Sequence, residues 1–273
     1  MKTYSPTTPS RRQMAIPNYN EILTASKPFK KLVKRIKKHS GRNNSGRITV
    51  RHQGGGNLKL YRMIDFRQTK INIPAKIETI EYDPYRSGFI ALAVYRDGER
   101  RYILASKDMN VGDEIIALEN APLKNGNRLA LKNIPVGYSV YNIELNRNGG
   151  KIARSAGSYA QVLAHDSGWT QLKLSSGEIR KVLWDNFASL GQTSNPDHGL
   201  TNIGKAGGSR VRGIRPTVRG TAMNPCDHPY GGGEGRQPRG TKRPKTRWGK
   251  ITGGRKTRKK KKWSNNLIIK RRK

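Results

Sequence analysis

One triplet combines residue types that can carry out covalent chemistry. Cys226-Asp227-His228 places a thiol, a carboxylate and an imidazole side by side, and these are the groups that thiol hydrolases use. Catalytic partners of this kind are normally brought together by the fold rather than by adjacency in the chain. Pro225 and Pro229 flank the triplet and restrict its backbone. The triplet therefore favours a rigid turn, and no catalytic residue is predicted.

Two glycine-rich stretches could approach phosphate groups closely. Gly231 to Gly235 reads Gly-Gly-Gly-Glu-Gly, and Gly54-Gly55-Gly56 is the second run. The longer stretch lacks the Gly-Lys-Ser/Thr ending of a nucleotide-binding loop. Backbone amides without bulky side chains can still reach the phosphates of RNA. We interpret both stretches as nucleic-acid contacts.

The histidines and the cysteine do not suggest a metal centre. The five histidines are scattered along the chain, and no two of them have metal-ligand spacing. Cys226 is the only cysteine, which excludes a multi-cysteine metal site and an internal disulfide. The sequence therefore predicts no metal site.

The distribution of charged residues divides the chain into three parts, and these parts must position the candidate residues named above. The formal net charge is +37, from 55 basic and 18 acidic residues among 273. Residues 1–73 hold 17 basic and 2 acidic residues, residues 74–196 hold 15 and 13, and residues 197–273 hold 23 and 3. Such an excess of one sign repels itself and is neutralised by a polyanion. We expect a nearly neutral folded centre between two basic arms that become ordered on nucleic acid.

The neutral centre has the pattern of short strands separated by turns. Asp97-Gly98 is a dipeptide favoured in tight hairpins, and similar turn signals recur at short intervals. Regular spacing of this kind predicts two small β-barrels. The expected strands of the first are 75–82, 89–95, 101–105 and 114–118, and those of the second are 139–145, 159–164, 169–174 and 179–184.

One segment of the N-terminal arm has a helical pattern. Phe29, Leu32, Val33 and Ile36 are spaced as one apolar face of a helix, with basic residues between them. Either a membrane surface or RNA could cover such a helix, and RNA also accounts for the second basic arm. No apolar run is long enough for a transmembrane helix, and residues 1–12 lack the apolar segment of a secretory signal.

Short motifs from Gly41 onward occur in a distinctive order. They include Gly41-Arg42-Asn43-Asn44, Ala153-Arg154-Ser155-Ala156-Gly157 and Asp227-His228-Pro229. In these motifs the chain resembles the family of large-subunit ribosomal protein two, in its bacterial or organellar type. The resemblance implies an all-β fold in which an OB-fold barrel precedes a Src-homology-3-like barrel, with long basic extended N- and C-terminal arms.

The expected boundaries combine the resemblance with the charge pattern. They are an N-terminal extension over 1–73, the OB-fold barrel over 74–127, the second barrel over 128–196 and the C-terminal arm over 197–273.

The resemblance also implies a function. The protein would be a structural constituent of the large ribosomal subunit, a primary binder of large-subunit ribosomal RNA, and a support for subunit association and for the peptidyl-transferase region. Its expected partners are that RNA, other ribosomal proteins and small-subunit RNA across the subunit bridge. We expect no enzyme activity, no membrane, no homo-oligomer and no cofactor beyond magnesium brought by the RNA.

Departures from the family pattern bear on the compartment. Tyr230 stands where a histidine is usual, Cys226 where a valine is usual and Tyr85 where an asparagine is usual, and residues 244–249 also differ. These changes indicate a divergent lineage. We expect the ribosome of an organelle, in the mitochondrial matrix, or of the bacterial cytoplasm, with the organelle slightly favoured.

The resemblance assigns residues to the RNA interface. Arg86 and Arg154 match RNA-binding positions, and His228 matches a histidine linked to peptidyl-transferase activity, to which we assign a structural RNA contact. Asn224 and Asp227 are expected beside His228 near the peptidyl-transferase region. The full set of predicted RNA contacts is Arg42, Arg47, Arg51, His52, Arg62, Arg86, Arg154, Arg212, Arg215, Arg219, His228, Arg236, Arg255, Lys256, Arg258 and Lys259.

Two other classes of function remain open at this point. A histone-like, DNA-compacting protein would be as basic, but the neutral barrel core and the lack of a dimerising helical pair disfavour it. An RNA-modifying enzyme would need a base or a nucleophile in a cleft of the barrels, and the strands and turns show none.

Overall fold

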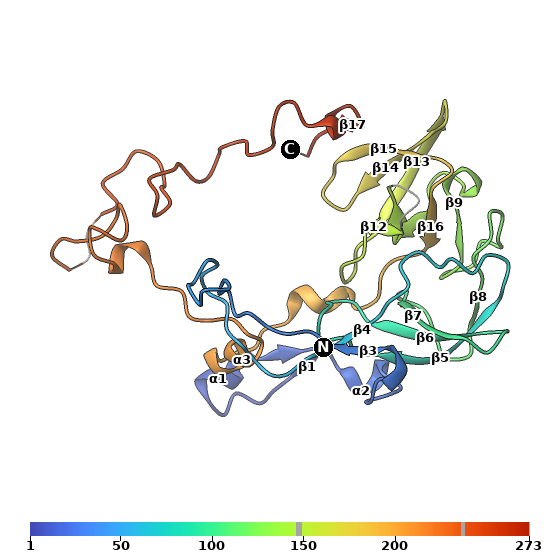
Figure 1. Ribbon diagram of the computed structural model, residues 1–273, viewed down its shortest axis with the longest axis horizontal. Helices are drawn as coiled ribbons and strands as arrows, with labels where there is room; N and C mark the ends of the chain where they lie inside the picture. Colours follow the sequence, from blue (N-terminus) through green and yellow to red (C-terminus); the bar gives the residue numbers. More distant parts are fainter. Residues whose placement is uncertain (146–148, 236–237, 273) are drawn as a thin grey trace. The chain divides into compact units, whose positions relative to one another are not determined.

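The computed structural model describes residues 1–145, 149–235 and 238–272 (Figure 1). The chain forms two compact units. We call Met1–Lys38, Leu58–Lys205 and Asn266–Lys273 the barrel unit, and His39–Asn57 with Ala206–Asn265 the basic unit. By sequence the basic unit holds 21 basic and 2 acidic residues.

The first sheet of the barrel unit follows the predicted strands closely. It is antiparallel in the order β7-β6-β5-β8 and is formed by β5 (Ala75–Glu81), β6 (Ile90–Tyr95), β7 (Arg100–Leu104) and β8 (Glu114–Ile115) (Figure 1). Gly98 adopts a φ of 82° in the β6–β7 hairpin, a conformation that glycine reaches without strain. Phe89, Ala91 and Ile103 lie in the core of this sheet.

The second sheet has seven antiparallel strands in the order β17-β15-β14-β13-β10-β16-β9. Its core contains Leu129, Val140 and Leu172. The strands are β9 (Arg128–Ala130), β10 (Ser139–Tyr141), β13 (Ala160–Asp166), β14 (Trp169–Leu174), β15 (Ile179–Leu183), β16 (Phe187–Leu190) and β17 (Ile268–Lys270). The all-β prediction of an OB-fold barrel followed by a Src-homology-3-like barrel is confirmed.

The strand predicted over 139–145 is broken in the structure. β10 ends at Tyr141, and β11 (Ile143–Glu144) leaves the large sheet to pair with β12 (Gly150–Ile152). Asn142, between them, has a φ of 49°, which a β-strand cannot accommodate. The break turns the chain from one sheet into the other.

The helix predicted over 29–36 is wrong. The structure has a 3-10 helix over Lys30–Leu32 and then β3 (Val33–Arg35), which pairs with β4 (Leu60–Arg62). Phe29 and Leu32 pack against buried Ile90, Leu92 and Tyr102. The Tyr102 hydroxyl accepts a hydrogen bond of 2.7 Å from the Phe29 backbone N–H. Strand pairing and this packing replace the helical hydrogen bonds, and β-branched Val33 suits a strand better than a helix.

The N-terminal residues fold onto the first barrel, which differs from the expected free arm. Tyr19 and Leu23 pack against the core of the first sheet, and Ala25 pairs with Glu81. This region contains β1 (Lys2–Thr3), β2 (Ala15–Ile16), α1 (Pro9–Arg12) and α2 (Tyr19–Ile22). Apolar contacts with the barrel therefore compensate for the ordering entropy that we expected only RNA to offset.

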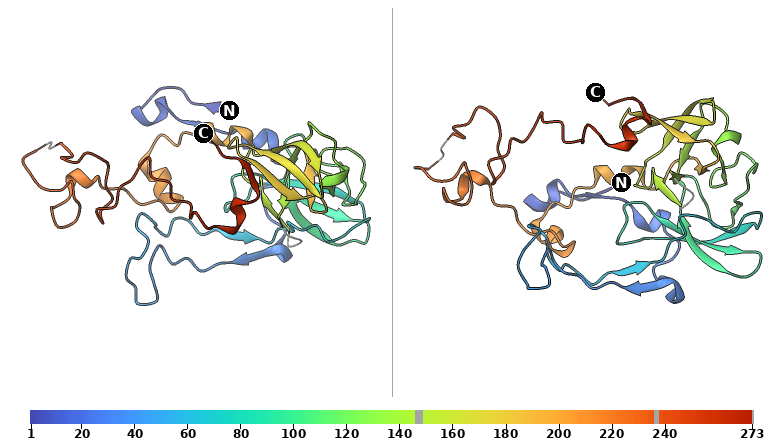
Figure 2. Two further views of the ribbon diagram at one scale, coloured as in Figure 1. Left: turned by 90° about the horizontal axis from the view of Figure 1, so that it is seen from above. Right: turned by 45° about the horizontal axis from the view of Figure 1, so that its top comes forward.

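The C-terminal arm also ends in the barrel unit. β17 pairs with β15, with Ile179 opposite Lys270 (Figure 1). The segment between, Ala206–Asn265, belongs to the basic unit and is mostly loop around α3 (Ala206–Val211) and 3-10 helices at Gly220–Ala222 and Trp263–Asn265 (Figure 2). Two further 3-10 helices, Leu131–Asn133 and Pro196–Leu200, lie in the barrel unit. The domain boundaries at 73, 127 and 196 stay predictions.

A buried ion pair joins β9 to β11. The Arg128 and Glu144 side chains are 1% and 6% exposed, and Nη2 of Arg128 donates to Oε1 of Glu144 at 2.9 Å. Nη1 also donates to the Asn142 carbonyl at 3.0 Å. Burying a single charge costs free energy that its partner offsets, so the Arg128 and Glu144 side chains are stable in the core only as a pair.

We expect Glu144→Ala to lower the free energy of unfolding by about 3–5 kcal/mol, because it leaves the Arg128 charge buried and unpaired. Urea denaturation of the full chain measures this loss. Glu119→Ala is the matched control, because Glu119 pairs with Lys132 on the surface and is 60% exposed; it should cost about 1 kcal/mol or less. Equal losses in the two variants would contradict a structural role for the buried pair.

Candidate nucleic-acid interface

Two arginines, one from each barrel, meet on a single aromatic ring. Arg86 lies in the turn after β5, where its backbone N–H donates to the Asp83 carbonyl at 3.2 Å. Arg154 follows β12. The guanidinium carbon of Arg86 lies 5.2 Å from the centre of the Phe66 ring, and that of Arg154 lies 4.6 Å from it. Both distances are within the range of cation–π attraction. We call Arg86, Phe66 and Arg154 the arginine clamp.

The two guanidinium groups of the clamp are held by further contacts. Arg86 forms an ion pair with the fully buried Asp83 side chain, and its Nη2 donates to the Tyr61 hydroxyl at 3.3 Å. Nη1 of Arg154 donates to the Gly150 carbonyl at 3.2 Å. A guanidinium carries five N–H donors, so these contacts use only some of them. Arg154 is exposed, so its remaining donors can bind a phosphate or a base edge in the fixed fork geometry of arginine. The Arg86 side chain is only 16% exposed and presents fewer of its donors to a partner.

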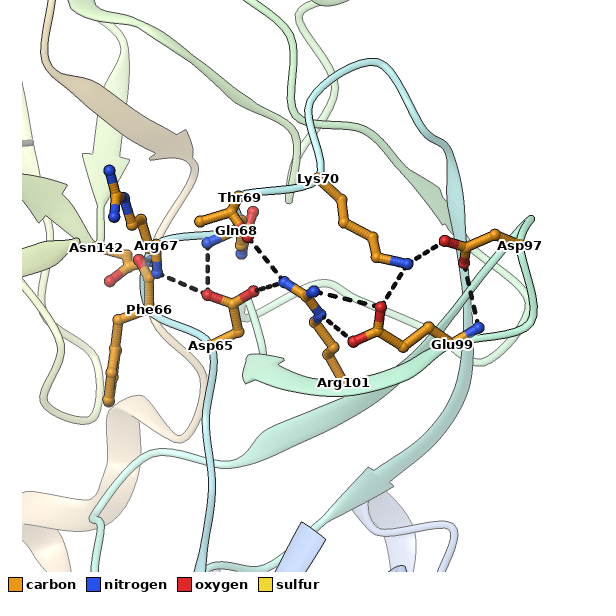
Figure 3. Close-up of polar contacts among 10 residues, drawn as sticks. All are labelled: Asp65, Phe66, Arg67, Gln68, Thr69, Lys70, Asp97, Glu99, Arg101 and Asn142. Atoms are coloured by element: carbon orange, nitrogen blue, oxygen red, sulfur yellow. Dashed lines mark hydrogen bonds and ion pairs between the residues drawn. The ribbon is translucent and has the colours of Figure 1, made fainter. Parts of the chain in front are cut away.

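Hydrogen bonds to both barrels hold the Asp65-Phe66 segment and so position the Phe66 ring (Figure 3). On the first barrel, Oδ2 of Asp65 accepts from Nη1 of Arg101 at 2.7 Å. On the second barrel, the Phe66 carbonyl accepts from Nδ2 of Asn142 and from the Gly150 backbone N–H, both at 3.1 Å. The ring is therefore fixed where residues of the two barrels can share it.

The same segment is tied to the β6–β7 hairpin by charges (Figure 3). Lys70 pairs with Asp97 and with Glu99, and Nε of Arg101 donates to Oε1 of Glu99 at 2.7 Å. Hydrogen bonds from Arg101 and Lys70 lower the pKa of Glu99 to about 2. A hydrogen bond from Lys70 likewise lowers the pKa of Asp97. Both carboxylates therefore stay ionised to low pH.

The Cys226-Asp227-His228 triplet is part of a compact turn. The Asn224 carbonyl accepts from the backbone N–H of Asp227 at 3.0 Å and of His228 at 3.3 Å. Nδ1 of His228 accepts from the Tyr230 backbone N–H at 3.1 Å. A Cβ on Gly220 would lie 2.6 Å from the imidazole, so the ring packs directly on backbone at a position that needs glycine. Cys226 is exposed.

Nδ1 of His228 is thus engaged within the protein, which leaves Nε2 as the ring atom available to a partner. The turn holds Asn224, Asp227 and His228 together. Their place near the peptidyl-transferase region stays a prediction.

Two family models match the chain in sequence order. Residues 29–117 match the family described as Ribosomal Proteins L2, RNA binding N-terminal domain, and residues 124–249 match Ribosomal Proteins L2, C-terminal domain. The chain belongs to the ribosomal protein L2 family. It is accordingly a structural, RNA-binding constituent of the large ribosomal subunit, and it is located in the ribosome with ribosomal RNA and other ribosomal proteins as partners. Neither matched model is an enzyme domain.

Most predicted RNA contacts of this L2 chain fall in the basic unit. Their arginine and lysine side chains are exposed there, and His52 and His228 are half-buried. The exposed set is Arg42, Arg47, Arg51, Arg212, Arg215, Arg219, Arg255, Lys256, Arg258 and Lys259. Arg236 lies outside the described residues.

Arg62 is unlike the other predicted contacts. It lies in β4, is only 8% exposed, and donates through Nη1 to the Leu60 carbonyl at 2.8 Å. This burial favours a structural role, although its assignment to the RNA interface stays a prediction.

Sequence reasoning did not single out Phe66 and Tyr61 as candidate RNA contacts. Both are aromatic residues within the basic stretch between Lys59 and Lys70, and aromatic residues among basic ones are a signal of nucleic-acid binding. The signal was too weak to distinguish these two residues from core residues, because their partners Arg86 and Arg154 are distant in sequence.

The described residues contain neither a cluster of metal-ligating side chains nor a helix that could cross a membrane. In residues 1–145, 149–235 and 238–272, no three or more histidine, cysteine or acidic side chains gather as a metal site would require. Within the same ranges, every helix is too short or too polar to cross a bilayer.

We expect Phe66→Leu to weaken binding of large-subunit RNA about tenfold. Leucine keeps the apolar volume but loses the ring that attracts both guanidinium groups, an attraction of about 0.5–2 kcal/mol per pair. Filter binding at fixed salt measures the affinity, and thermal unfolding checks the fold. Phe66→Tyr keeps the ring and should bind as the wild type does. A leucine variant of full affinity would show that the ring is not needed.

The Glu99 pairing predicts a pH-dependent stability. Because the pKa of Glu99 falls from its ordinary 4.5 to about 2 on folding, the stabilisation is fully present above about pH 4.5 and is lost as the pH falls toward 2. The melting temperature of Glu99→Gln should therefore fall less than that of the wild type between pH 6 and pH 3. Glu114→Gln controls for the loss of one negative charge, because Glu114 is an exposed residue of β8. Parallel melting curves of Glu99→Gln and wild type would contradict the pairing.

Proposed function

We propose that this L2 chain binds large-subunit ribosomal RNA through the arginine clamp of the barrel unit and through the exposed side chains of the basic unit. The observation that carries the proposal is the meeting of Arg86 and Arg154 on the Phe66 ring, at 5.2 and 4.6 Å. Two preorganised guanidinium forks from separate barrels can hold one RNA segment against both. Binding there would depend on the relative position of the barrels, which the Phe66 carbonyl helps to fix.

The basic unit would supply the larger, less specific share of the affinity. Its 21 basic residues against 2 acidic ones make it a polycation along loops. Neutralising phosphates with such residues releases counterions, so this share of binding should weaken steeply with salt.

The role at the peptidyl-transferase region is proposed because residues Asn224–His228 resemble a motif of the family. We propose that the turn reaches the peptidyl-transferase region and that the protein supports association of the subunits through small-subunit RNA. His228 would act there as a structural contact through Nε2, since Nδ1 accepts the Tyr230 N–H. We propose no catalytic step, no cofactor beyond RNA-bound magnesium and no homo-oligomer.

The compartment is proposed from sequence departures alone. Cys226, Tyr230 and Tyr85 depart from the family pattern, which slightly favours a mitochondrial ribosome over a bacterial one. Sedimentation of organellar and bacterial extracts, probed for this chain after a high-salt wash, tests this proposal. Recovery with the large subunit of the bacterial extract alone would overturn the organellar preference.

We expect Arg154→Ala and Arg86→Ala each to weaken binding of large-subunit RNA by about 1–3 kcal/mol, the cost of losing a bidentate contact. Thermal unfolding checks the fold of Arg86→Ala, because this variant leaves the fully buried Asp83 carboxylate unpaired. Affinity is measured by filter binding over a range of salt concentrations. Arg96→Ala is the matched control, because Arg96 is exposed at the β6–β7 hairpin and its loss removes the same charge. Affinities of the Arg86 and Arg154 variants equal to that of the control would contradict the clamp as the binding site.

A further inference from the structure

A cleft of about 400 Å³ lies within the basic unit. Two segments distant in sequence form it, residues 40–55 and 215–223. Backbone hydrogen bonds hold them together: the Gly54 N–H donates to the Gly213 carbonyl at 2.8 Å, and the Arg215 N–H donates to the His52 carbonyl at 3.0 Å. The cleft is thus a product of the fold of this unit.

The cleft combines cationic and apolar walls. Arg42, Arg51 and Arg215 supply the cationic groups, and His52 adds an imidazole. The apolar lining comes from Ile48, Val50, Val218 and Met223. Ile48 and Val218 are each 56% exposed, and scattered exposure of that kind would be ordinary. Apolar side chains gathered in one concave site instead mark a surface that a partner covers.

The occupant must match both kinds of wall. An unstacked nucleotide has an apolar base with a flat face and an anionic phosphate, and proteins read RNA mainly at such splayed-out bases. The volume lies within the roughly 300–1,000 Å³ of small-ligand sites. A unit with 21 basic and 2 acidic residues attracts a polyanionic strand rather than a neutral ligand.

We propose that this cleft receives one unpaired nucleotide of the ribosomal RNA, with its base between the apolar side chains and its phosphate on the arginines. The proposal rests on the proposed function, because it assumes that the basic unit lies against RNA. This site would recognise a base, whereas the other basic side chains of the unit would neutralise phosphates.

The glycine run gives a way to block the cleft without disturbing its walls. A Cβ on Gly56 would lie 2.7 Å from the Gly213 nitrogen, and one on Gly54 would lie 3.2 Å from Cγ of Arg215. Gly56 therefore needs glycine for the approach of the two segments, and a side chain at Gly54 would require the Arg215 side chain to shift. Gly55 differs, because a Cβ there would meet only Oγ of Ser40 at 3.8 Å, an ordinary contact. Gly55 lines the cleft, so a large side chain at this position would occupy it.

The test compares Gly55→Leu with Gly55→Ala in the full chain, bound to transcribed large-subunit RNA and probed with dimethyl sulfate at unpaired bases. We expect the wild type and Gly55→Ala to protect a base that Gly55→Leu leaves reactive. Gly55→Leu should also bind about tenfold more weakly, with an unchanged salt dependence because the arginines remain. Val218→Asp, which places a carboxylate in the cleft, should expose the same base.

The outcomes separate this proposal from the function on which it rests. Normal RNA binding with identical base protection in Gly55→Leu and Val218→Asp would overturn the cleft assignment alone. A wild type that does not bind the RNA would overturn both.

Discussion

Repulsion among like charges is the constraint on which the rest of this structure depends. Residues 1–73 and 197–273 together carry 40 basic and 5 acidic residues, whereas residues 74–196 carry 15 and 13. The central region can fold because its charges pair with one another, as Arg101 does with Glu99 and Arg128 with Glu144. The basic unit has too few carboxylates for such pairing. RNA is therefore required to neutralise it, and large-subunit membership supplies that RNA.

The junction of the two barrels holds the arginine clamp, the site that we propose for RNA. Asn142 is central to it: its positive φ ends β10, its carbonyl accepts from buried Arg128, and its amide donates to the Phe66 carbonyl. The ring of Phe66 then lies between Arg86 and Arg154. A single strained residue thus connects the buried ion pair of the second barrel to the proposed RNA clamp.

The residues that most resemble an active site have another explanation. Cys226, Asp227 and His228 lie in a turn whose geometry depends on glycine, because side chains on Gly220 and Gly231 would strike the imidazole and the Asn224 carbonyl. Nδ1 of His228 is already bound to a backbone N–H. The turn is built to present a fixed surface, which is what an RNA-packing element needs.

The sequence by itself determined the charge partition, the family and the main strands of both barrels. Strand periodicity and turn dipeptides such as Asp97-Gly98 are local signals, and they gave β5, β6 and β14 nearly to the residue. The apolar spacing from Phe29 to Ile36 was misleading because a stripe of this kind also fits a 3-10 turn followed by a strand, and only pairing with β4 decides between them. The return of β17 to β15, the placing of Phe66 between two distant arginines and the cleft between residues 40–55 and 215–223 were decided by tertiary structure. Each depends on contacts between residues far apart in the chain, which leave no periodic pattern in the sequence.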